Sequence, residues 1–552
     1  MKAGPAGLAT TGTSIGLTIL VALLGPSVME PPLPGRPGQP PYSMVMHPSA
    51  YLAVALAAAA LVAGTLGLSL SMLAARRGWA PPPGALVAAG IVAAAVLAFL
   101  PPFGSADHLS YAAYGRMLVT GHDPYATGPS VLGHDPVSRA VEDWRTTPSV
   151  YGTVASAGQA LASGIAGTSV RLTVFVLSLL NLAAFAGAGL LLHRLAGGDR
   201  GRQLRAALLW TVNPLLLYEL VAGTHVDTQA AVFAVAAVAV FPTSSPNGSP
   251  RWHRVARCVA AGGLIGFGAA VKLTGALPGG GLAFAARRRW RWLAGLAAGF
   301  LVSAGVALAS GGPHVLRQAV RGGSFVSIGS PWRVTRTALS AAFGDGMAGP
   351  LVSAGSVILA LILLALLLRG LPGPRDSPDT DLACSLPRIN AGLGQSGVVG
   401  GGQRRRARAG VPKGAQSAAG AVAGTTGKAG AQVAARAALA CTLAWLFAWP
   451  YVLPWYDALA WALLPLVAWS WVDWLVLART AALAFGYLPA IAHPAERLPA
   501  DLGWLQSVVR TGVTPAILAG LTVALMVACA PRPPVHDHGK FFADSTRKSP
   551  RS

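Results

Sequence analysis

The sequence YLAVALAAAALVAGTLGLSLSML occupies residues 51–73 and contains no charged side chain. A helix needs about 20 apolar residues to cross the roughly 30 Å hydrocarbon core of a bilayer, so this stretch predicts a transmembrane helix. Similar apolar runs occupy residues 85–100, 170–192, 351–368 and 513–530. Because backbone groups in lipid must find partners within their own segment, we expect all of them to be helices. The chain is therefore predicted to be an all-α polytopic membrane protein.

The composition also indicates a membrane protein rather than a soluble one. Hydrophobic residues make up 53% of the 552 residues and charged residues only 11%, compared with about 25% charged residues in soluble domains. The formal net charge is +23, which in a soluble protein would suggest nucleic-acid binding. Here the basic residues gather beside the apolar segments, as they do in cytoplasmic loops, so we expect the membrane and no nucleic acid as a partner.

Arginine clusters beside the apolar segments predict the orientation of the chain. Cytoplasmic loops of membrane proteins carry an excess of Lys and Arg. Such clusters lie at residues 76–77, 194–205, 251–257, 287–291 and 404–408. When all of them and Lys2 are placed in the cytoplasm, the chain is expected to form about 12–14 transmembrane helices with both termini inside.

This orientation defines two external loops and one tight turn. Residues 102–169 form the first loop, and its apolar part, residues 150–166, is expected to be a re-entrant or surface helix. Residues 310–349 form the second loop. The arginine clusters on both sides of residues 258–286 are placed inside, so this segment must be a hairpin of two short helices that turns near Lys272.

The chain divides into four regions by composition. Residues 1–371 are predicted to form an N-terminal transmembrane body that carries the external loop 102–169. Residues 372–432 are rich in Gly, Ala, Ser and Arg without an apolar period, so we expect a disordered cytoplasmic linker. Residues 433–531 return to apolar segments and are predicted to be C-terminal transmembrane helices, whereas residues 532–552 form a basic cytoplasmic tail.

Polar residues at the start of the first external loop are the leading candidates for chemistry. Asp107 is followed by Tyr111, Tyr114 and Met117 at helical spacing, which predicts a short helix along the membrane surface. A carboxylate at the start of this helix, on the lip of a cavity, can act as a general base toward a hydroxyl group. Ser105 or Asp107 can equally cap the helix, so spacing alone leaves both roles open.

Three further polar residues lie where a membrane protein rarely places them. His225 and Asp227 follow an apolar segment at an expected external helix end, as a binding pair or as an ordinary capped turn. Lys272 is the one charge inside the predicted hairpin. A buried lysine in a membrane is costly and usually functional, although a lysine can also extend its ammonium group to the interface.

Two other external groups have competing interpretations. Arg333 and Arg336 lie in the second external loop, where they can hold a phosphate group or remain plain solvated charges. The tripeptide Trp-Tyr-Asp at residues 455–457 lies at an expected external turn, and we interpret its aromatic residues as part of the interfacial aromatic belt.

Several short motifs occur in an order that resembles a known enzyme family. They are SYAAYGR at residues 110–116, GHDPY at 121–125, SVYG at 149–152, NPL at 213–215, GTHVD at 223–227 and VKL at 271–273. Together with an aspartate just after an early transmembrane helix, this set is similar to the actinobacterial α-1,6-mannosyltransferases that use polyprenyl-phosphomannose, which are GT-C glycosyltransferases. The resemblance covers about residues 85–282 and, more weakly, 449–457.

The resemblance implies a GT-C-type bundle in the plasma membrane whose external loops carry the active site. It implies that Asp107 is the catalytic base and that no divalent metal or other cofactor is needed. The residues expected to bind donor or acceptor are His108, Arg116, Asp123, Tyr125, His225, Asp227, Lys272, Arg333 and Arg336. In two places the chain departs from the pattern, because Val226 stands where the family has Asn, and His108 stands where many GT-C enzymes carry a second acidic residue.

The expected reaction is transfer of mannose from polyprenyl-phosphomannose to an α-1,6-mannan or lipomannan-type lipoglycan, with inversion at the anomeric carbon. A lipid or sugar transporter or flippase is the alternative from another class, and a GT-C enzyme with another sugar or acceptor is a third. A transporter would favour internal repeats and several charges at mid-membrane depth. The sequence shows no clear repeat between its halves.

The predicted orientation can be tested with inserted epitope tags. Tags near Ser130 and Gly322 should be accessible from outside intact cells, whereas a tag near Gly420 should become accessible only after permeabilisation, because the arginine clusters assign residue 420 to the cytoplasm. Labelling of Gly420 in intact cells would contradict the orientation and with it the external placement of Asp107.

Overall fold

The computed structural model describes residues 3–242, 250–322, 325–371, 432–490 and 498–530. Within these ranges the regular secondary structure is helical and no β-strand is present, as the apolar runs predict. The predicted tail 532–552 and the predicted linker 372–432, apart from Gln432, lie outside the described residues.

The described residues contain eight helical segments that are long and apolar enough to cross a membrane, together with four shorter apolar helices. The long segments are Ala3–Leu24 (α1), Ala50–Arg76 (α2), Val170–Leu195 (α7), Arg200–Ala222 (α8, α9 and two intervening π-helical turns), Arg251–Val271 (α11), Trp290–Gly311 (α13), Asp345–Gly370 (α16) and Ala500–Cys529, which ends in α20 (Thr514–Cys529). The shorter helices are Pro83–Ala98 (α3), Asp227–Val240 (α10), Leu273–Ala286, which includes α12 (Leu277–Ala286), and Gln432–Ala448. These segments confirm the predicted all-α polytopic membrane fold.

The remaining helices lie in the two predicted external loops and near the C-terminus. The first loop contains α4 (Asp107–Val119), α5 (Pro136–Ala140) and α6 (Thr153–Ala166). The second contains α14 (His314–Gly322) and α15 (Pro331–Phe343). The C-terminal region adds α18 (Ala458–Leu463) and α19 (Trp471–Gly486). With 14 residues, α6 is too short to cross a bilayer, in agreement with the predicted re-entrant or surface helix.

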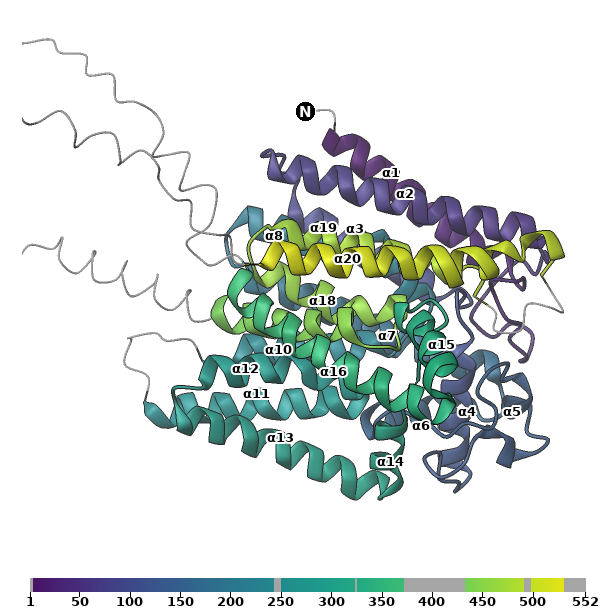
Figure 1. The fold of residues 1–552 in the computed structure, drawn as a ribbon. Coiled ribbons are helices and arrows are strands. Elements are labelled where there is room, and N and C mark those ends of the chain that lie inside the picture. Colours follow the sequence, from purple (N-terminus) through teal and green to yellow (C-terminus); the bar gives the residue numbers. More distant parts are fainter. Residues whose placement is uncertain (1–2, 243–249, 323–324, 372–431, 491–497, 531–552) are drawn as a thin grey trace, which may run out of the picture.

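The long helices lie roughly parallel, so the bundle has two distinct ends (Figure 1). α8 and α12 mark one end, and α4, α5, α14 and α15 gather at the other. Arginine-rich helix termini lie at the α8 end, including the last turns of α2 and α7 and the first turns of α8 and α11. The loops that begin at Asp107 therefore lie at the opposite end of the bundle from these arginines.

The predicted hairpin around Lys272 turns at the expected place, but its first helix is longer than expected. α11 contains 21 residues, so the prediction of two short helices is wrong for this element. The extra length arises because Arg251, Arg254 and Arg257 lie within the helix, where long arginine stems extend the guanidinium groups toward water. Lys272 then adopts an extended backbone, which ends the helix and starts the turn into α12.

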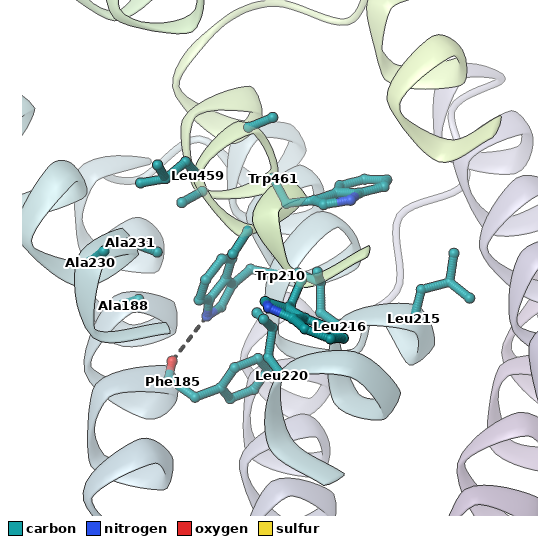
Figure 2. Packing of buried hydrophobic residues seen from close by; sticks show 14 of the residues in the cluster. Phe185, Ala188, Trp210, Leu215, Leu216, Leu220, Ala230, Ala231, Leu459 and Trp461 are labelled. Atoms are coloured by element: carbon teal, nitrogen blue, oxygen red, sulfur yellow. Dashed lines mark hydrogen bonds between the residues drawn. The ribbon is translucent and has the colours of Figure 1, made fainter. Parts of the chain in front are cut away.

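The segment Arg200–Ala222 lies in the middle of the bundle, and it is buried from Leu204 to its end. Trp210 packs near its centre, where its indole stacks on Phe185 and donates a hydrogen bond of 2.9 Å to the Phe185 carbonyl group (Figure 2). Halfway along, the side chain of Asn213 accepts hydrogen bonds from the N–H groups that follow Pro214, so the break at the proline leaves these donors satisfied. This rigid central segment leads directly to His225.

Buried ion pairs attach the C-terminal helices to the rest of the bundle. Arg205 lies 2.5 Å from Asp473 at the start of α19 and also donates to the Leu464 carbonyl group. Arg479 pairs with Asp457, and both side chains are fully buried. Removal of one partner from such a pair leaves an uncompensated charge. Residues on both sides of 372–431 thus share one hydrophobic core.

Helices α11 and α13 pack closely because glycines face the neighbouring backbone. A Cβ atom at Gly299 would lie 1.9 Å from the carbonyl oxygen of Val259. Ser303 on the same helix reinforces the contact by donating to the Gly263 carbonyl group at 3.0 Å. The two helices therefore approach at a distance that only glycine at position 299 permits.

We expect Gly299→Ala to destabilise the protein by about 1–3 kcal/mol, since the added methyl group forces the two helices apart. The measurement is thermal unfolding of the purified protein in detergent. Gly305→Ala on the same helix is the matched control, because a Cβ atom there meets no heavy atom within 4 Å. Equal melting temperatures for the two variants would contradict the close α11–α13 contact.

Candidate functional site

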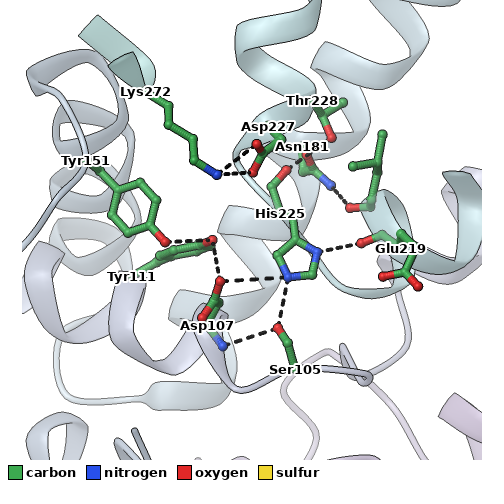
Figure 3. Close-up of polar contacts among 11 residues, drawn as sticks. Ser105, Asp107, Tyr111, Tyr151, Asn181, Glu219, His225, Asp227, Thr228 and Lys272 are labelled. Carbon is green, nitrogen blue, oxygen red and sulfur yellow. Dashed lines mark hydrogen bonds and ion pairs between the residues drawn. The ribbon is translucent and has the colours of Figure 1, made fainter. Parts of the chain in front are cut away.

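Asp107 is the first residue of α4, and its carboxylate points into the protein rather than capping the helix (Figure 3). The N-cap position is Ala106, which makes no side-chain cap, and the hydroxyl oxygen of Ser105 accepts the Asp107 N–H at 3.3 Å. The Asp107 carboxylate instead accepts a hydrogen bond of 3.4 Å from the Tyr111 hydroxyl. Of the two roles left open by the sequence, the structure therefore excludes that of a helix cap for the Asp107 side chain.

α4 is enclosed by protein instead of lying on the membrane surface. Nine of its residues, including His108, Tyr111 and Tyr114, are buried, and the helix packs against α6 and α7. The side chain of Asp107 keeps 17% of its surface exposed. Asp107 is thus a carboxylate at the edge of an apolar interior with access from one side.

His225 lies beside Asp107 and connects it to the central segment. Its Nε2 atom is 2.9 Å from the Ser105 hydroxyl and 3.9 Å from the Asp107 carboxylate, and its Nδ1 atom is 2.5 Å from the Glu219 carbonyl oxygen. A carbonyl oxygen only accepts, so Nδ1 carries the proton and Nε2 accepts the Ser105 hydroxyl. Burial lowers the pKa of His225 to about 3, and the imidazole is therefore neutral.

The ring of His225 is held in place by stacking on Trp455. The two ring centroids are 3.7 Å apart and the planes differ by 12°. Gly223 and Thr224 shape the turn that presents the histidine, with Thr224 at a φ of 53°. His225, which the sequence suggested as a binding residue, thus forms part of a preorganised wall beside Asp107.

Asp227 and Lys272 form a buried ion pair on the same side of the cluster. The Lys272 ammonium group lies 2.8 and 2.9 Å from the two carboxylate oxygens of Asp227. It also lies 3.6 Å from the centroid of the Tyr456 ring. The side chains of Lys272 and Asp227 are 10% and 4% exposed. Lys272 is consequently a positive charge anchored at the end of α11, not a lysine that extends to water.

Two tyrosines form a chain of hydrogen bonds that ends at Asp107. Tyr151 donates to Tyr111 at 3.4 Å, and their rings meet edge to face. Tyr151 reaches this position because Gly152 lies against α11, where its N–H donates to the Val271 carbonyl group at 3.0 Å. A Cβ atom at Gly152 would lie 2.2 Å from the Ala270 carbonyl oxygen, so the SVYG motif sets the distance between the first loop and Lys272.

The surroundings of Asp107 raise the pKa of its carboxyl group to about 6. Burial is the main cause, and the negative charges of Asp227 and Asp143 act in the same direction. The positive charge of Lys272 and the hydrogen bond from Tyr111 oppose the rise. A carboxylate with such a pKa is mostly ionised at neutral pH and more basic than a solvated aspartate, which suits a general base.

Two cavities meet at Asp107. The first, of about 400 Å³, contains Lys272 and is lined largely by aromatic and apolar side chains, among them Tyr151, Trp445 and Trp449. The second, of about 430 Å³, contains Asp143, Arg510 and the backbone around Ser327. The residues common to both linings are Asp107, Trp144, Tyr451, Leu453 and Trp455. A molecule in either cavity can therefore contact Asp107.

The other predicted residues of the first loop hold the loop together and do not line these cavities. Arg116 pairs with Asp135 at 2.8 Å. Asp123 lies 2.8 Å from Nδ1 of His314 on α14. Their hydrogen bonds are within the protein, so a binding role for these two side chains is not supported by their positions.

Tyr125 and His108 are also buried away from the two cavities. The hydroxyl group of Tyr125 donates to Ser156 at 2.7 Å. His108 has no hydrogen-bond partner for either ring nitrogen among the described residues, and burial lowers its pKa to about 3. Both side chains pack inside the protein around α4 and α6 and line neither of the two cavities at Asp107.

Arg333 and Arg336 are not brought to the cluster. Both lie on α15, with Arg333 exposed and Arg336 half-buried, and neither lines the two cavities at Asp107. The prediction that they hold the donor phosphate rested on their place in the second external loop. In the structure, α15 instead packs on α16 and α20.

Trp455 and Tyr456 line the first cavity, so their interpretation as an aromatic belt is wrong. Trp455 is only 2% exposed and stacks on His225, and Tyr456 faces Lys272. Sequence analysis also did not single out Asp143, Trp144, Tyr451 and Arg510. One feature of the sequence could have indicated this part of the site. Aromatic residues are concentrated between 445 and 456, in a larger number than one helix end at a membrane interface would require.

The buried Asp227–Lys272 pair is testable without an activity assay. Asp227→Ala leaves the Lys272 ammonium group without its carboxylate and should cost about 3–5 kcal/mol, whereas the apolar double variant Asp227→Leu with Lys272→Met should recover much of this loss. The measurement is thermal unfolding in detergent. Arg202→Ala is the control, because it removes an exposed pair with Asp199 at 4.0 Å and leaves the Asp199 cap of α8 in place, and such pairs contribute little. A melting temperature of Asp227→Ala equal to that of the control would contradict the pair.

Comparison with known proteins links the first half of the chain to one family. Residues 9–288 match the model of the α-(1→6)-mannopyranosyltransferase N-terminal domain. A Mycolicibacterium smegmatis protein named "Probable alpha-(1->6)-mannopyranosyltransferase" is 31% identical over 229 residues, which cover 38% of this chain and 40% of that protein. α-(1→6)-Mannopyranosyltransferase A of Corynebacterium glutamicum is 28% identical over 129 residues, covering 23% and 26%. The matched segments span less than half the length of either relative.

Among solved structures, the apo form of ArnT from Cupriavidus metallidurans is similar over 76% of this chain and 71% of its own, at 15% identity and a TM-score of 0.32. The family match contains Asp107, His225, Asp227 and Lys272, which the fold assembles around two cavities. The chain therefore belongs to the α-(1→6)-mannopyranosyltransferase family.

Proposed function

We propose that this chain is an integral membrane glycosyltransferase that transfers mannose from polyprenyl-phosphomannose to an α-1,6-mannan or lipoglycan acceptor. The observation that carries the proposal is the position of Asp107 between two cavities. Group transfer between two large substrates needs two binding spaces that meet at the reacting atoms. The matched relatives are named as mannopyranosyltransferases, which supports a transferase over the transporter alternative.

Asp107 is proposed to take the proton from the acceptor hydroxyl as that oxygen attacks the anomeric carbon of the donor. The new bond joins the acceptor oxygen to the anomeric carbon, and the bond from that carbon to the phosphate oxygen breaks. The electron pair leaves with the polyprenyl phosphate, and attack opposite the leaving group inverts the anomeric centre. The raised pKa of Asp107, about 6, strengthens it as a base without leaving it protonated at neutral pH.

The first cavity is proposed to hold the donor. Its apolar side chains include Leu273 and Leu277, and Leu273 is 57% exposed at the protein surface, which suits entry of a polyprenyl chain from the bilayer. The Lys272 ammonium group has three N–H donors. Two of them are used by the Asp227 carboxylate, and because Lys272 also lines the first cavity, the third is proposed to reach the donor phosphate there.

The second cavity is proposed to hold the acceptor glycan. Asp143 and backbone around Ser327 line it, and such polar groups suit sugar hydroxyls. Arg510 donates to the carbonyl groups of Gly486, Tyr487 and Pro489, so it shapes the wall rather than replacing Lys272 as the phosphate ligand. Trp144 lies between the two spaces, where an indole face can stack on a sugar ring.

The active site is proposed to face the extracytoplasmic side of the plasma membrane. The supporting observation is that α4, which begins with Asp107, lies at the opposite end of the bundle from the arginine-rich α8 (Figure 1). The arginines of α8 are expected in the cytoplasm by the positive-inside rule. A lipid-linked donor that presents its sugar at the outer leaflet would then meet Asp107 directly.

Asp107→Asn should lower mannosyl transfer by roughly 10²–10⁴-fold, because the amide keeps the shape of the side chain but cannot take a proton. The measurement is transfer of radiolabelled mannose from polyprenyl-phosphomannose by equal amounts of folded wild-type and variant protein. Donor binding should be largely kept. Near-normal turnover in Asp107→Asn would exclude Asp107 as the base and leave His225 and Asp227 as the next candidates.

Asp123→Asn is the matched control from the same loop. Asp123 is solvent-accessible and lines neither cavity, so this variant should retain most of its activity. The pH dependence supplies a second readout. The wild-type rate should fall as the pH drops below about 6, since the carboxylate of Asp107 becomes protonated there, and the residual activity of Asp107→Asn should lack this inflection.

A further inference from the structure

A third cavity, of about 1100 Å³, lies where α11 and α13 begin. Its lining residues are Arg251, Trp252, Arg254, Val255, Ala256, Val259, Arg289, Trp290, Arg291 and Trp292. At about 1.5 Å per residue, the 21 residues of α11 place this cavity roughly 30 Å from Lys272. It therefore lies at the arginine-rich end of the bundle and is separate from the two cavities at Asp107.

The charges around this cavity are of one sign. Four of its lining residues are arginines and none is acidic. Arginine recognises phosphate well because its planar guanidinium group can donate two parallel hydrogen bonds. The arginine-rich lining therefore favours an anionic ligand, and a phosphate ester fits the paired donors of the guanidinium groups.

The two helix N-termini that border the cavity add to its positive character. α11 begins after Pro250 and α13 after Arg289, and neither helix has a side-chain cap or an acidic residue in its first turn. The first N–H groups of a helix lack partners within the helix and favour negative charge. Both termini lie at the same arginine-lined cavity, so both favour the binding of an anion there.

The tryptophans identify the environment of that anion as a membrane interface. Trp252 and Trp290 are 65% and 71% exposed, and exposed tryptophan is typical of the headgroup level of a bilayer. Below them, Val255 and Val259 lead down the apolar surface of α11, a helix long and apolar enough to cross the membrane. A ligand with an anionic head and apolar chains satisfies both parts of the cavity.

We propose that this cavity binds the phosphate headgroup of an anionic phospholipid from the leaflet at the arginine-rich end of the bundle. The guanidinium groups of Arg254 and Arg291 contact the phosphate from the two helices, while the acyl chains follow the apolar side of α11. Basic pockets between helices on the cytoplasmic side are suited to such lipids. The bound lipid joins α11 to α13 and stabilises the pair, because a ligand that binds only the folded state raises its stability.

The test compares lipids that differ only in headgroup charge. The full-length protein is purified in a neutral detergent, and its melting temperature is measured with increasing amounts of phosphatidylglycerol or of phosphatidylcholine with the same acyl chains. We expect a saturable rise with phosphatidylglycerol alone. In the double variant Arg254→Gln with Arg291→Gln, the apparent affinity should fall roughly 30-fold, given the contribution of each arginine near an anionic headgroup.

The control variant is Arg76→Gln with Arg77→Gln, which removes the same charge from an exposed helix terminus outside the cavity. It should keep the response of the wild type. Equal responses of the two double variants, or equal effects of the two lipids, would overturn the proposal. A rise with inorganic phosphate at the same concentrations would also overturn it, since a free anion would then suffice. Mannosyl transfer plays no part in this readout, so the outcome is independent of the proposed reaction.

Discussion

Backbone polar groups inside a bilayer need partners, and this constraint confines irregular chain to the ends of helices. In this protein the proposed chemistry lies at such ends. Asp107 is the first residue of α4, Asp227 is the first residue of α10, and Lys272 follows the last residue of α11. The turn at Pro454–Asp457 adds two aromatic side chains to the same place. Three helix ends and one turn that are distant in the sequence thus supply one cluster.

The cluster is stable because its charges balance one another within a low-dielectric interior. A buried lysine is costly alone, but Lys272 contacts both oxygens of Asp227 and the face of the Tyr456 ring. Neutral His225 donates to the Glu219 backbone carbonyl group and faces Asp107 without adding charge. Among the described residues, Asp107 is therefore the carboxylate that lines both cavities, which is the property a base between two substrates needs.

The bundle separates two kinds of positive charge. Lys272 lies at one end, paired and buried beside the proposed reaction site, whereas the arginines of α8, α11 and α13 lie near the other. α11 connects the two ends and packs closely on α13 through Gly299. A lipid bound at the arginine-lined cavity would therefore stabilise the helix whose far end positions Lys272. The same few helices therefore carry the arginines that orient the chain in the membrane and hold the site residues in position.

The sequence by itself determined the helical membrane fold, the approximate helix count and the start of α4, since apolar runs and arginine clusters act locally and leave a direct pattern. It also indicated Asp107, His225, Asp227 and Lys272 as exceptional residues. Only the tertiary structure decided which polar residues meet. Arg116 and Tyr125 make contacts within the first loop, whereas Asp123 pairs with His314 in the second loop. Arg333 and Arg336 lie elsewhere on α15, and Trp455 stacks on His225 from about 230 residues away. Such contacts depend on how whole helices pack, and no residue spacing along the chain encodes the distance between two helices.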